Sequence, residues 1–237
     1  MHEYYRKNQK KLLKMMDKML LPVKDEIEEI TGVDGKQFIE EAKKIYIKKY
    51  LEEMPYIGGK KNSGTTNLTN ACFLVAMYDL GRNYGMTAYQ AGEISVHSFE
   101  KYFGKFSKWL RSPIQWLARK NLSQKLLKKM IKQRKEFSDK YPYAWESEYR
   151  EPNEEYTHQL IVHSCGIEKF LRDKDVAEFI PYLCNLDYAM FKEFGLPLCR
   201  KNTIACGDKT CDFVFSRDGK IQESWPPQFL NEDNEYK

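Results

Sequence analysis

Residues 141–150, with the sequence YPYAWESEYR, mark the point where the chain changes from helical to extended periodicity. From Tyr143 to Arg150, aromatic or small residues at odd positions alternate with mostly charged residues at even positions. A period of two is typical of a strand with one covered face. The polar stretch 151–154, EPNE, then predicts a turn into a second strand over residues 156–165, so an antiparallel hairpin is expected here.

Upstream of this point, apolar side chains recur every three or four residues, as at Leu12, Met16 and Met19. This spacing is typical of helices with one buried face. Thr66 or Asn67 is a suitable residue to cap the N-terminus of a helix. The pattern predicts helices over residues 67–82, 87–104 and 107–140, the last one broken near Pro113 and Asn121.

Downstream, helical spacing returns over residues 173–194, with Pro181 allowed at a helix start and Gly195 ending the helix. A second hairpin is predicted from strands 198–206 and 211–216, with a turn around Gly207.

The order of elements indicates the fold class. Repeated crossover units, which parallel sheets require, are missing. We therefore expect an α+β fold in which a helical N-terminal layer packs on a small C-terminal antiparallel sheet of about four strands. The predicted organisation is one domain over residues 1–237, with a mainly helical part (1–140), a sheet-containing part (141–216) and a tail (217–237).

The composition limits which cellular compartment and which binding partners are expected. The chain has 237 residues, 42% of them hydrophobic and 31% charged, a balance typical of a globular protein. Its net charge of +5 comes largely from runs such as residues 128–135, which we interpret as solvated helix faces and not as a nucleic-acid surface.

No stretch approaches the roughly 18 apolar residues of a membrane span, and no signal peptide is recognisable. We expect a cytoplasmic protein with no membrane or nucleic-acid partner, and the sequence leaves self-association open.

Six cysteines are too few for a disulfide scaffold in a chain of this length, so their expected roles are packing, metal binding or catalysis. His163 and Cys165 are two residues apart on a predicted strand, and Cys184 and Asp187 are three apart on a predicted helix. Each pair should therefore share a face. A helix lying over the sheet would bring the pairs together, as a nucleophile with its base requires.

The spacing of the cysteines does not favour a structural metal site. No C-x-x-C pair is present, and the four residues between Cys206 and Cys211 fit a tight hairpin better. Scattered ligands that converge in the fold remain an alternative. We predict neither a metal nor a cofactor.

A glycine-rich loop is the second candidate site. Gly58 and Gly59 allow backbone amides to approach an anion, Lys60 adds positive charge, and Asn62 and Asn67 follow closely. The loop matches neither the Walker pattern nor the dinucleotide fingerprint. An ordinary loop between helices is the alternative interpretation.

Two stretches resemble the L-2-amino-thiazoline-4-carboxylate hydrolase family. The first is residues 55–62, PYIGGKKN, and the second runs from residues 184–188, CNLDY, to residues 207–213, GDKTCDF. Cys165 stands where the first cysteine of the second signature is expected, so the similarity extends discontinuously over about residues 54 to 216. The hairpin 207–213 also resembles vinyl-reductase-associated small-molecule-binding domains.

The resemblance implies a hydrolase that opens the C–N bond of a small cyclic amidine, such as 2-amino-thiazoline-4-carboxylate, giving N-carbamoyl-cysteine in cysteine metabolism. From their chemistry, Cys184 or Cys165 is the candidate nucleophile or water-orienting residue, and Asp187, with His163 nearby, is the candidate acid/base. The loop containing Gly58, Gly59, Lys60, Asn62 and Asn67 would hold the substrate carboxylate. The alternative is a non-catalytic sensor that holds a small molecule or a metal.

Overall fold

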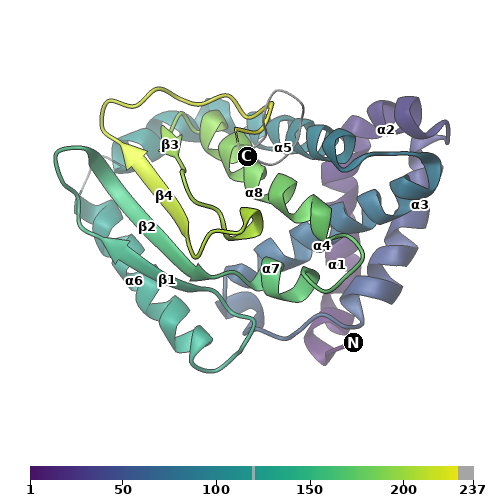
Figure 1. Cartoon of the computed structure of the whole chain (residues 1–237), viewed down its shortest axis with the longest axis horizontal. Coiled ribbons are helices and arrows are strands. Elements are labelled where there is room, and N and C mark those ends of the chain that lie inside the picture. The colour runs from purple at the N-terminus through teal and green to yellow at the C-terminus, as the bar shows by residue number, and fades with distance from the viewer. Residues whose placement is uncertain (119–120, 229–237) are drawn as a thin grey trace.

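The computed structural model describes residues 1–118 and 121–228. Figure 1 shows an antiparallel sheet at one end of the molecule and helices α1 to α4 at the other. The α-helices are α1 (Glu3–Leu20), α2 (Lys24–Thr31), α3 (Gly35–Ile45), α4 (Gly64–Gly81), α5 (Ala88–Ala118), α6 (Asn121–Ser138), α7 (Gly166–Leu171) and α8 (Ile180–Glu193). The strands are β1 (Glu146–Arg150), β2 (Tyr156–Ser164), β3 (Leu198–Cys199) and β4 (Cys211–Ser216).

Several short helical turns complete the description. A π-helix, Tyr46–Leu51, continues α3. The 3₁₀ turns are Leu21–Val23, Gly59–Lys61, Arg82–Tyr84, Ala177–Phe179 and Ile204–Cys206. In the described part of the chain, no helix is both long enough and apolar enough to cross a membrane.

Helix α4 is at the centre of the helical half. Fifteen of its 18 residues are buried, on every side of the helix. A helix that is apolar all round belongs in a core, because burying each aliphatic or aromatic side chain stabilises the fold by about 1.5–3 kcal/mol. Its neighbours in the hydrophobic core include Tyr5, Phe38 and Tyr46, from α1, α3 and the π-helix. The same core continues to Val162 and Cys211 of the sheet.

The sheet has the strand order β1-β2-β4-β3, and all three pairings are antiparallel. Its inner face faces α6 and α8: Arg134 of α6 donates a hydrogen bond to Ser147 of β1, and the Phe191 ring of α8 packs on Phe215 of β4. Side chains such as Glu148 point to the outer face. The predicted α+β class, with helices N-terminal to a four-stranded antiparallel sheet, is confirmed.

The first hairpin is shorter than predicted. β1 begins at Glu146 instead of Tyr143. The Trp145 side chain is buried against Gly64 and Gly166, and the backbone before Glu146 therefore does not follow the strand. β2 ends at Ser164, and Cys165 is the N-cap residue of α7.

The predicted strand 198–206 is largely wrong, since only Leu198 and Cys199 pair with β4. The carboxylate of Asp212 accepts hydrogen bonds from the backbone amides of Lys201 (2.9 Å) and Asn202 (2.7 Å). These two amides therefore do not form the hydrogen bonds between strands that a longer β3 would require. Gly207 has the positive φ, 97°, that the turn was expected to need.

Three helix predictions also need correction. The helix expected at residue 67 already begins at Gly64, so neither Thr66 nor Asn67 caps it. The predicted stretch 87–104 continues without a break into the first part of the stretch 107–140, since α5 runs from Ala88 through Pro113 to Ala118. A separate helix, α6, begins at Asn121, where the second break was expected. Pro113 has no amide proton, so the carbonyl of Trp109, four residues earlier, lacks its usual helical donor. The Trp109 side chain is 82% exposed, so this carbonyl lies on the outer side of the helix.

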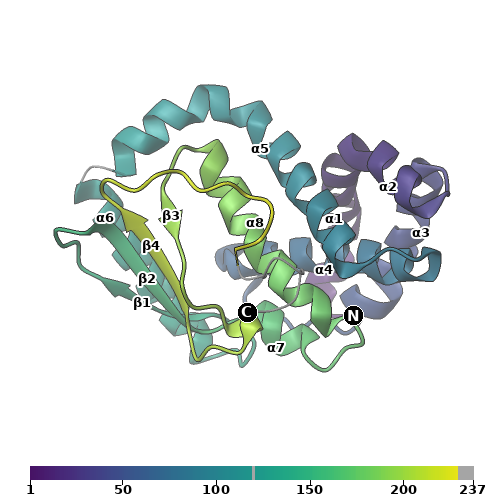
Figure 2. The same cartoon turned by 45° about the horizontal axis from the view of Figure 1, so that its top comes forward.

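Figure 2 shows α5 arching from the helical half toward the sheet. The helix predicted over residues 173–194 begins only at Ile180, with Pro181 in its first turn as expected. Of the predicted tail, residues 229–237 lie outside the described residues. The single-domain organisation stays a prediction.

Two aspartates of the β3–β4 connection should differ in their effect on stability. Asp212 is buried and accepts two amide hydrogen bonds, whereas Asp208 is exposed and accepts one, from the backbone amide of Thr203 at 2.7 Å. We expect Asp212→Ala to lower the free energy of unfolding by about 3 kcal/mol and Asp208→Ala by about 1 kcal/mol. Denaturant unfolding of both variants measures this difference. Equal losses would contradict the assignment of Asp212 as the residue that holds the connection.

Candidate functional site

A buried ion pair joins α8 to the segment that follows β3. The guanidinium of Arg200 donates from Nη1 to Oδ2 of Asp187 at 3.0 Å and to the backbone carbonyl of Cys184 at 2.9 Å. Only 4% of the Arg200 side chain is accessible to solvent. Arg200 thus fixes both the acid of the candidate site and the helical turn that carries the candidate cysteine.

The position of Arg200 is set by more than its acidic partner. Its guanidinium lies over the Phe213 ring on the inner face of the sheet, 4.3 Å from the ring centre, and Nη2 reaches the Thr203 hydroxyl at 3.4 Å. Burial acts to lower the pKa of Arg200, but Asp187 and the neighbouring thiol and phenol groups together raise it by more, so the guanidinium stays charged. Arg200 is a fixed cation.

A second arginine approaches the same carboxylate from α6. Arg134 is half-buried, and its Nη1 donates to the Ser147 hydroxyl of β1 at 3.2 Å. Burial lowers the pKa of Arg134, whereas the charges of Asp187 and Cys165 act to raise it. The charges of two guanidinium groups therefore act on one carboxylate.

Asp187 lies deep in the protein but is still reachable. Burial raises its pKa above the ordinary aspartate value, although Arg200 and Arg134 both act to lower it. At the same time 34% of its side chain is accessible, and Oδ1 has no hydrogen-bond partner among the described residues. A carboxylate with a raised pKa and one free oxygen is suited to accept or donate a proton.

Three thiols surround this carboxylate. Electrostatic contacts link Cys184 to Cys165, Cys211 and Asp187, so the structure brings the two predicted cysteines and the predicted acid together. Burial raises the pKa of the Cys165 thiol to about 11, despite the amides of Glu168 and Ile167, and raises that of Cys184 well above its usual value. Both thiols are therefore neutral near pH 7.

Cys211 has a more structural position. It is buried on the inner face of the sheet, on the same side of β4 as Phe213. Its Sγ accepts a hydrogen bond from the backbone amide of Ile204 at 3.2 Å. Burial raises its pKa as well, and Arg200 acts in the opposite direction.

The structure separates His163 from the other predicted site residues. His163 lies exposed on the outer face of the sheet, where Nε2 is 3.3 Å from Oε2 of Glu148. The expectation that His163 and Cys165 share a face fails because β2 ends between them, at Ser164, and strand parity does not continue into α7.

The glycine-rich loop makes contacts of its own. Gly58 is closely approached by the Phe137 ring and Gly59 by the Tyr4 ring. The Asn62 side chain is buried and spans the loop, since it donates to the Ile57 carbonyl at 2.6 Å and accepts from the Gly64 amide at 2.9 Å.

The remaining loop residues stay apart from the acid. Lys60 and Asn67 are exposed. The charged groups that act on the pKa of Asp187 are Arg200 and Arg134, and Lys60 is not among them. The positive charge next to Asp187 therefore comes from these two arginines.

Both arginines were missed from the sequence. For Arg134 a signal existed: it follows Leu127, Met130 and Ile131 at helical spacing and so falls on the half-buried face of α6. The prediction that residues 128–135 form a fully solvated helix face did not take this helical spacing into account. Arg200 carries no comparable pattern, because it follows a two-residue strand. Within residues 1–118 and 121–228, no group of three or more His, Cys, Asp and Glu residues could hold a metal ion.

Comparison with known proteins gives one match. Residues 69–215, more than half of the chain, match the family model described as L-2-amino-thiazoline-4-carboxylic acid hydrolase. This range contains Cys165, Cys184, Asp187 and both arginines, whereas the glycine-rich loop at residues 55–62 lies outside it. No curated protein and no solved structure matches the chain.

The raised thiol pKa values lead to a testable expectation. Alkylation requires the thiolate, so Cys165 and Cys184 should react with iodoacetamide at pH 7.5 at least about tenfold more slowly than the same cysteines after unfolding in guanidinium chloride. Peptide mass spectrometry at timed intervals measures each site separately. Rapid, selective labelling of Cys184 in the folded protein would instead indicate an activated thiolate.

Proposed function

The chain belongs to the L-2-amino-thiazoline-4-carboxylic acid hydrolase family, and from this premise we propose that it hydrolyses a small cyclic amidine that carries a carboxylate. The observation that carries the proposal is one partly accessible carboxylate, Asp187, which is bonded to Arg200 and is also under the electrostatic influence of Arg134.

The charge balance supports an anionic substrate. With Asp187 ionised, the two arginines leave an excess of one positive charge in a partly desolvated space. Uncompensated charge is costly where water is excluded, and a substrate carboxylate would neutralise it. Of the two cations, Arg200 already binds Asp187 and the Cys184 carbonyl, so Arg134 is the group with more capacity for a substrate carboxylate.

Asp187 would act as the acid/base. Its ionised form accepts a proton from a water molecule while the water oxygen attacks the amidine carbon of the ring, and it passes this proton to the ring nitrogen as the C=N bond becomes single. The tetrahedral carbon then carries the new hydroxyl, two nitrogens and the ring sulfur. The raised pKa of Asp187 suits it to both halves of this proton transfer.

The product identifies the bond that breaks. N-carbamoyl-cysteine keeps both nitrogens on the former amidine carbon, so its formation requires the C–S bond to break after water adds across C=N. As the C–S bond breaks and the carbonyl forms, Asp187 accepts the proton of the new hydroxyl and passes it to the leaving sulfur, which becomes a thiol. The sequence predicted that the ring C–N bond breaks, but this would give the S-carbamoyl isomer. Mass spectrometry of the products after thiol labelling distinguishes the two, because only the N-carbamoyl product has a free thiol.

We assign the cysteines to positioning. No histidine is among the groups that act on the pKa of Cys184 or Cys165, His163 lies on the outer face, and burial keeps both thiols protonated. A protonated thiol is a poor nucleophile but a weak hydrogen-bond donor. Cys184 would thus orient the attacking water.

A second candidate function follows from the same thiols. A pocket whose sulfur groups are all unreactive also fits a non-catalytic small-molecule sensor. Calorimetry and product analysis with 2-amino-thiazoline-4-carboxylate separate the candidates. Turnover supports the hydrolase, whereas saturable binding with no product over many hours supports the sensor.

Two substitutions separate the roles of the acid and the thiol. We expect Asp187→Asn to lower kcat by about 100-fold or more, because the amide cannot accept the proton of water. Cys184→Ser should keep kcat within about tenfold, since a hydroxyl can still orient water. Single-turnover assays measure both, with Cys199→Ser as the matched control and thermal melts to verify folding. A dead but folded Cys184→Ser would make its sulfur the nucleophile.

The pH dependence tests the electrostatics. Asp187 must be ionised to act as a base, so kcat/KM should rise with pH through its pKa. Arg134 acts to lower that pKa, and Arg134→Gln should therefore move the acid limb to higher pH and raise KM for the carboxylate substrate. Lys132→Gln, which removes an exposed charge from the same helix, is the control. An acid limb that stays in place in Arg134→Gln would exclude Asp187 as the titrating group.

A further inference from the structure

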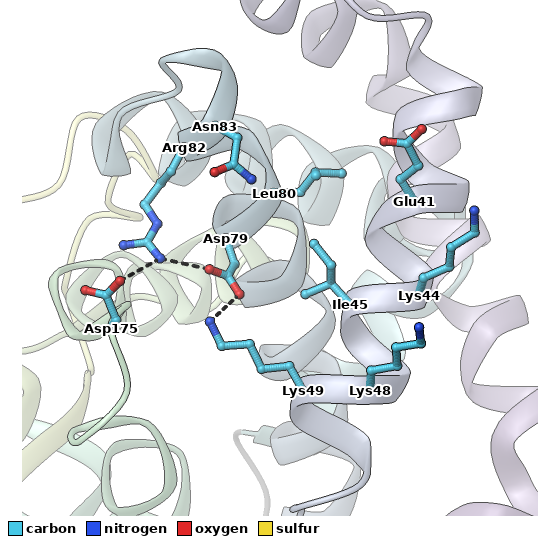
Figure 3. Close-up of a pocket in the computed structure, with 10 residues that line it drawn as sticks. All are labelled: Glu41, Lys44, Ile45, Lys48, Lys49, Asp79, Leu80, Arg82, Asn83 and Asp175. Carbon is cyan, nitrogen blue, oxygen red and sulfur yellow. Dashed lines mark hydrogen bonds and ion pairs between the residues drawn. The ribbon is translucent and has the colours of Figure 1, made fainter.

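A separate hollow of about 700 Å³ lies at the other end of the molecule, between the π-helix and the C-terminal end of α4 (Figure 3). Lys44, Lys48 and Lys49 line it from one helical stretch, and Asp79 and Arg82 line it from the other side. The volume is within the range of small-molecule sites, about 300–1,000 Å³. None of the candidate hydrolase residues belongs to this lining.

The floor of the hollow is an already neutralised carboxylate. Asp79 is 9% exposed and accepts hydrogen bonds from Lys49 at 2.8 Å, from the Tyr50 hydroxyl at 2.9 Å and from Arg82 at 2.8 Å. Asp175 pairs in turn with Arg82 at 3.3 Å. The charges of Lys49 and Arg82 are thus matched within the protein.

Lys44 and Lys48 are different, because neither pairs with a carboxylate among the described residues. Both are exposed, and Figure 3 shows their ammonium groups on the wall opposite Arg82. Residues four apart on a helix lie on the same side, and like charges at this spacing destabilise the helix. Glu41, one turn before Lys44, lines the same wall, so this wall carries two ammonium groups and one carboxylate. The remaining positive charge favours an anion.

The backbone provides an independent argument. Tyr46–Leu51 forms a π-helix, a rare conformation that occurs mostly at functional sites. It lies at this hollow and carries both Lys48 and Lys49. Ile45 and Leu80 supply an apolar part of the lining, which can cover the carbon skeleton of a ligand.

We propose that this hollow binds a small organic anion with two or more negative charges, of the phosphorylated or polycarboxylate class. Lys44 and Lys48 hold the charged groups, and the Asn83 side chain, which also lines the hollow, supplies an amide for a polar group of the ligand. The site is independent of the proposed hydrolase site and does not rest on that activity.

Isothermal titration calorimetry with pyrophosphate and with citrate, at constant ionic strength, tests the proposal on the full chain. We expect saturable binding of at least one probe, weakened tenfold or more in Lys44→Gln/Lys48→Gln. The control Lys10→Gln/Lys14→Gln removes the same charge at the same spacing from exposed positions on α1 and should bind within twofold of wild type. Thermal melts verify that both variants fold.

The two probes distinguish the chemical class of the ligand. Binding of pyrophosphate alone supports a phosphorylated ligand, and binding of citrate alone supports a polycarboxylate. No saturable heat with either probe, or equal weakening in both double variants, would overturn the proposal, since the second result would show only a general effect of net charge.

Discussion

The sheet-containing half depends on the buried pairing of Arg200 with Asp187. This one guanidinium bonds α8 through both a side chain and a backbone carbonyl, and it stacks on Phe213 of β4. Breaking a buried pair by removing one partner generally costs about 3–5 kcal/mol, because the remaining charge is left without compensation. The irregular connection after β3 is therefore stabilised from its interior, by Arg200 and by the amide contacts of Asp212, and not by a ladder of strand hydrogen bonds.

A structural ion pair would need only one arginine. The presence of Arg134 beside the same carboxylate adds a positive charge that the protein itself does not neutralise, in a position where burial already lowers the pKa of that arginine. A fold optimised for stability alone would avoid this cost. A partly accessible acid next to surplus positive charge is instead the arrangement expected where an anionic ligand completes the electrostatics.

The fold was largely predictable because its signals are local. The change to period two near residue 143, the turn at residues 151–154 and the return of helical spacing at Pro181 all depend on neighbouring residues. The failures came where tertiary contacts override local preference. Trp145 packs into the core and shortens β1, and the carboxylate of Asp212 captures amides that the alternating pattern assigned to a strand. Neither contact is visible in a window of ten residues.

The site was predictable to a lesser degree, for a related reason. Helix parity correctly placed Cys184 and Asp187 on one side of α8. Cys165 joins them from the N-cap of α7 and not through strand parity, so the pairing of His163 with Cys165 failed where β2 ends. Side-chain chemistry alone made the cysteines look like nucleophiles, whereas their reactivity depends on burial, which only the fold defines. Because burial keeps these thiols protonated, we propose the acid/base role for Asp187, whose pKa is raised toward the working range of such a group. Asp187 reaches that state through burial, and its arginine partners keep it ionisable.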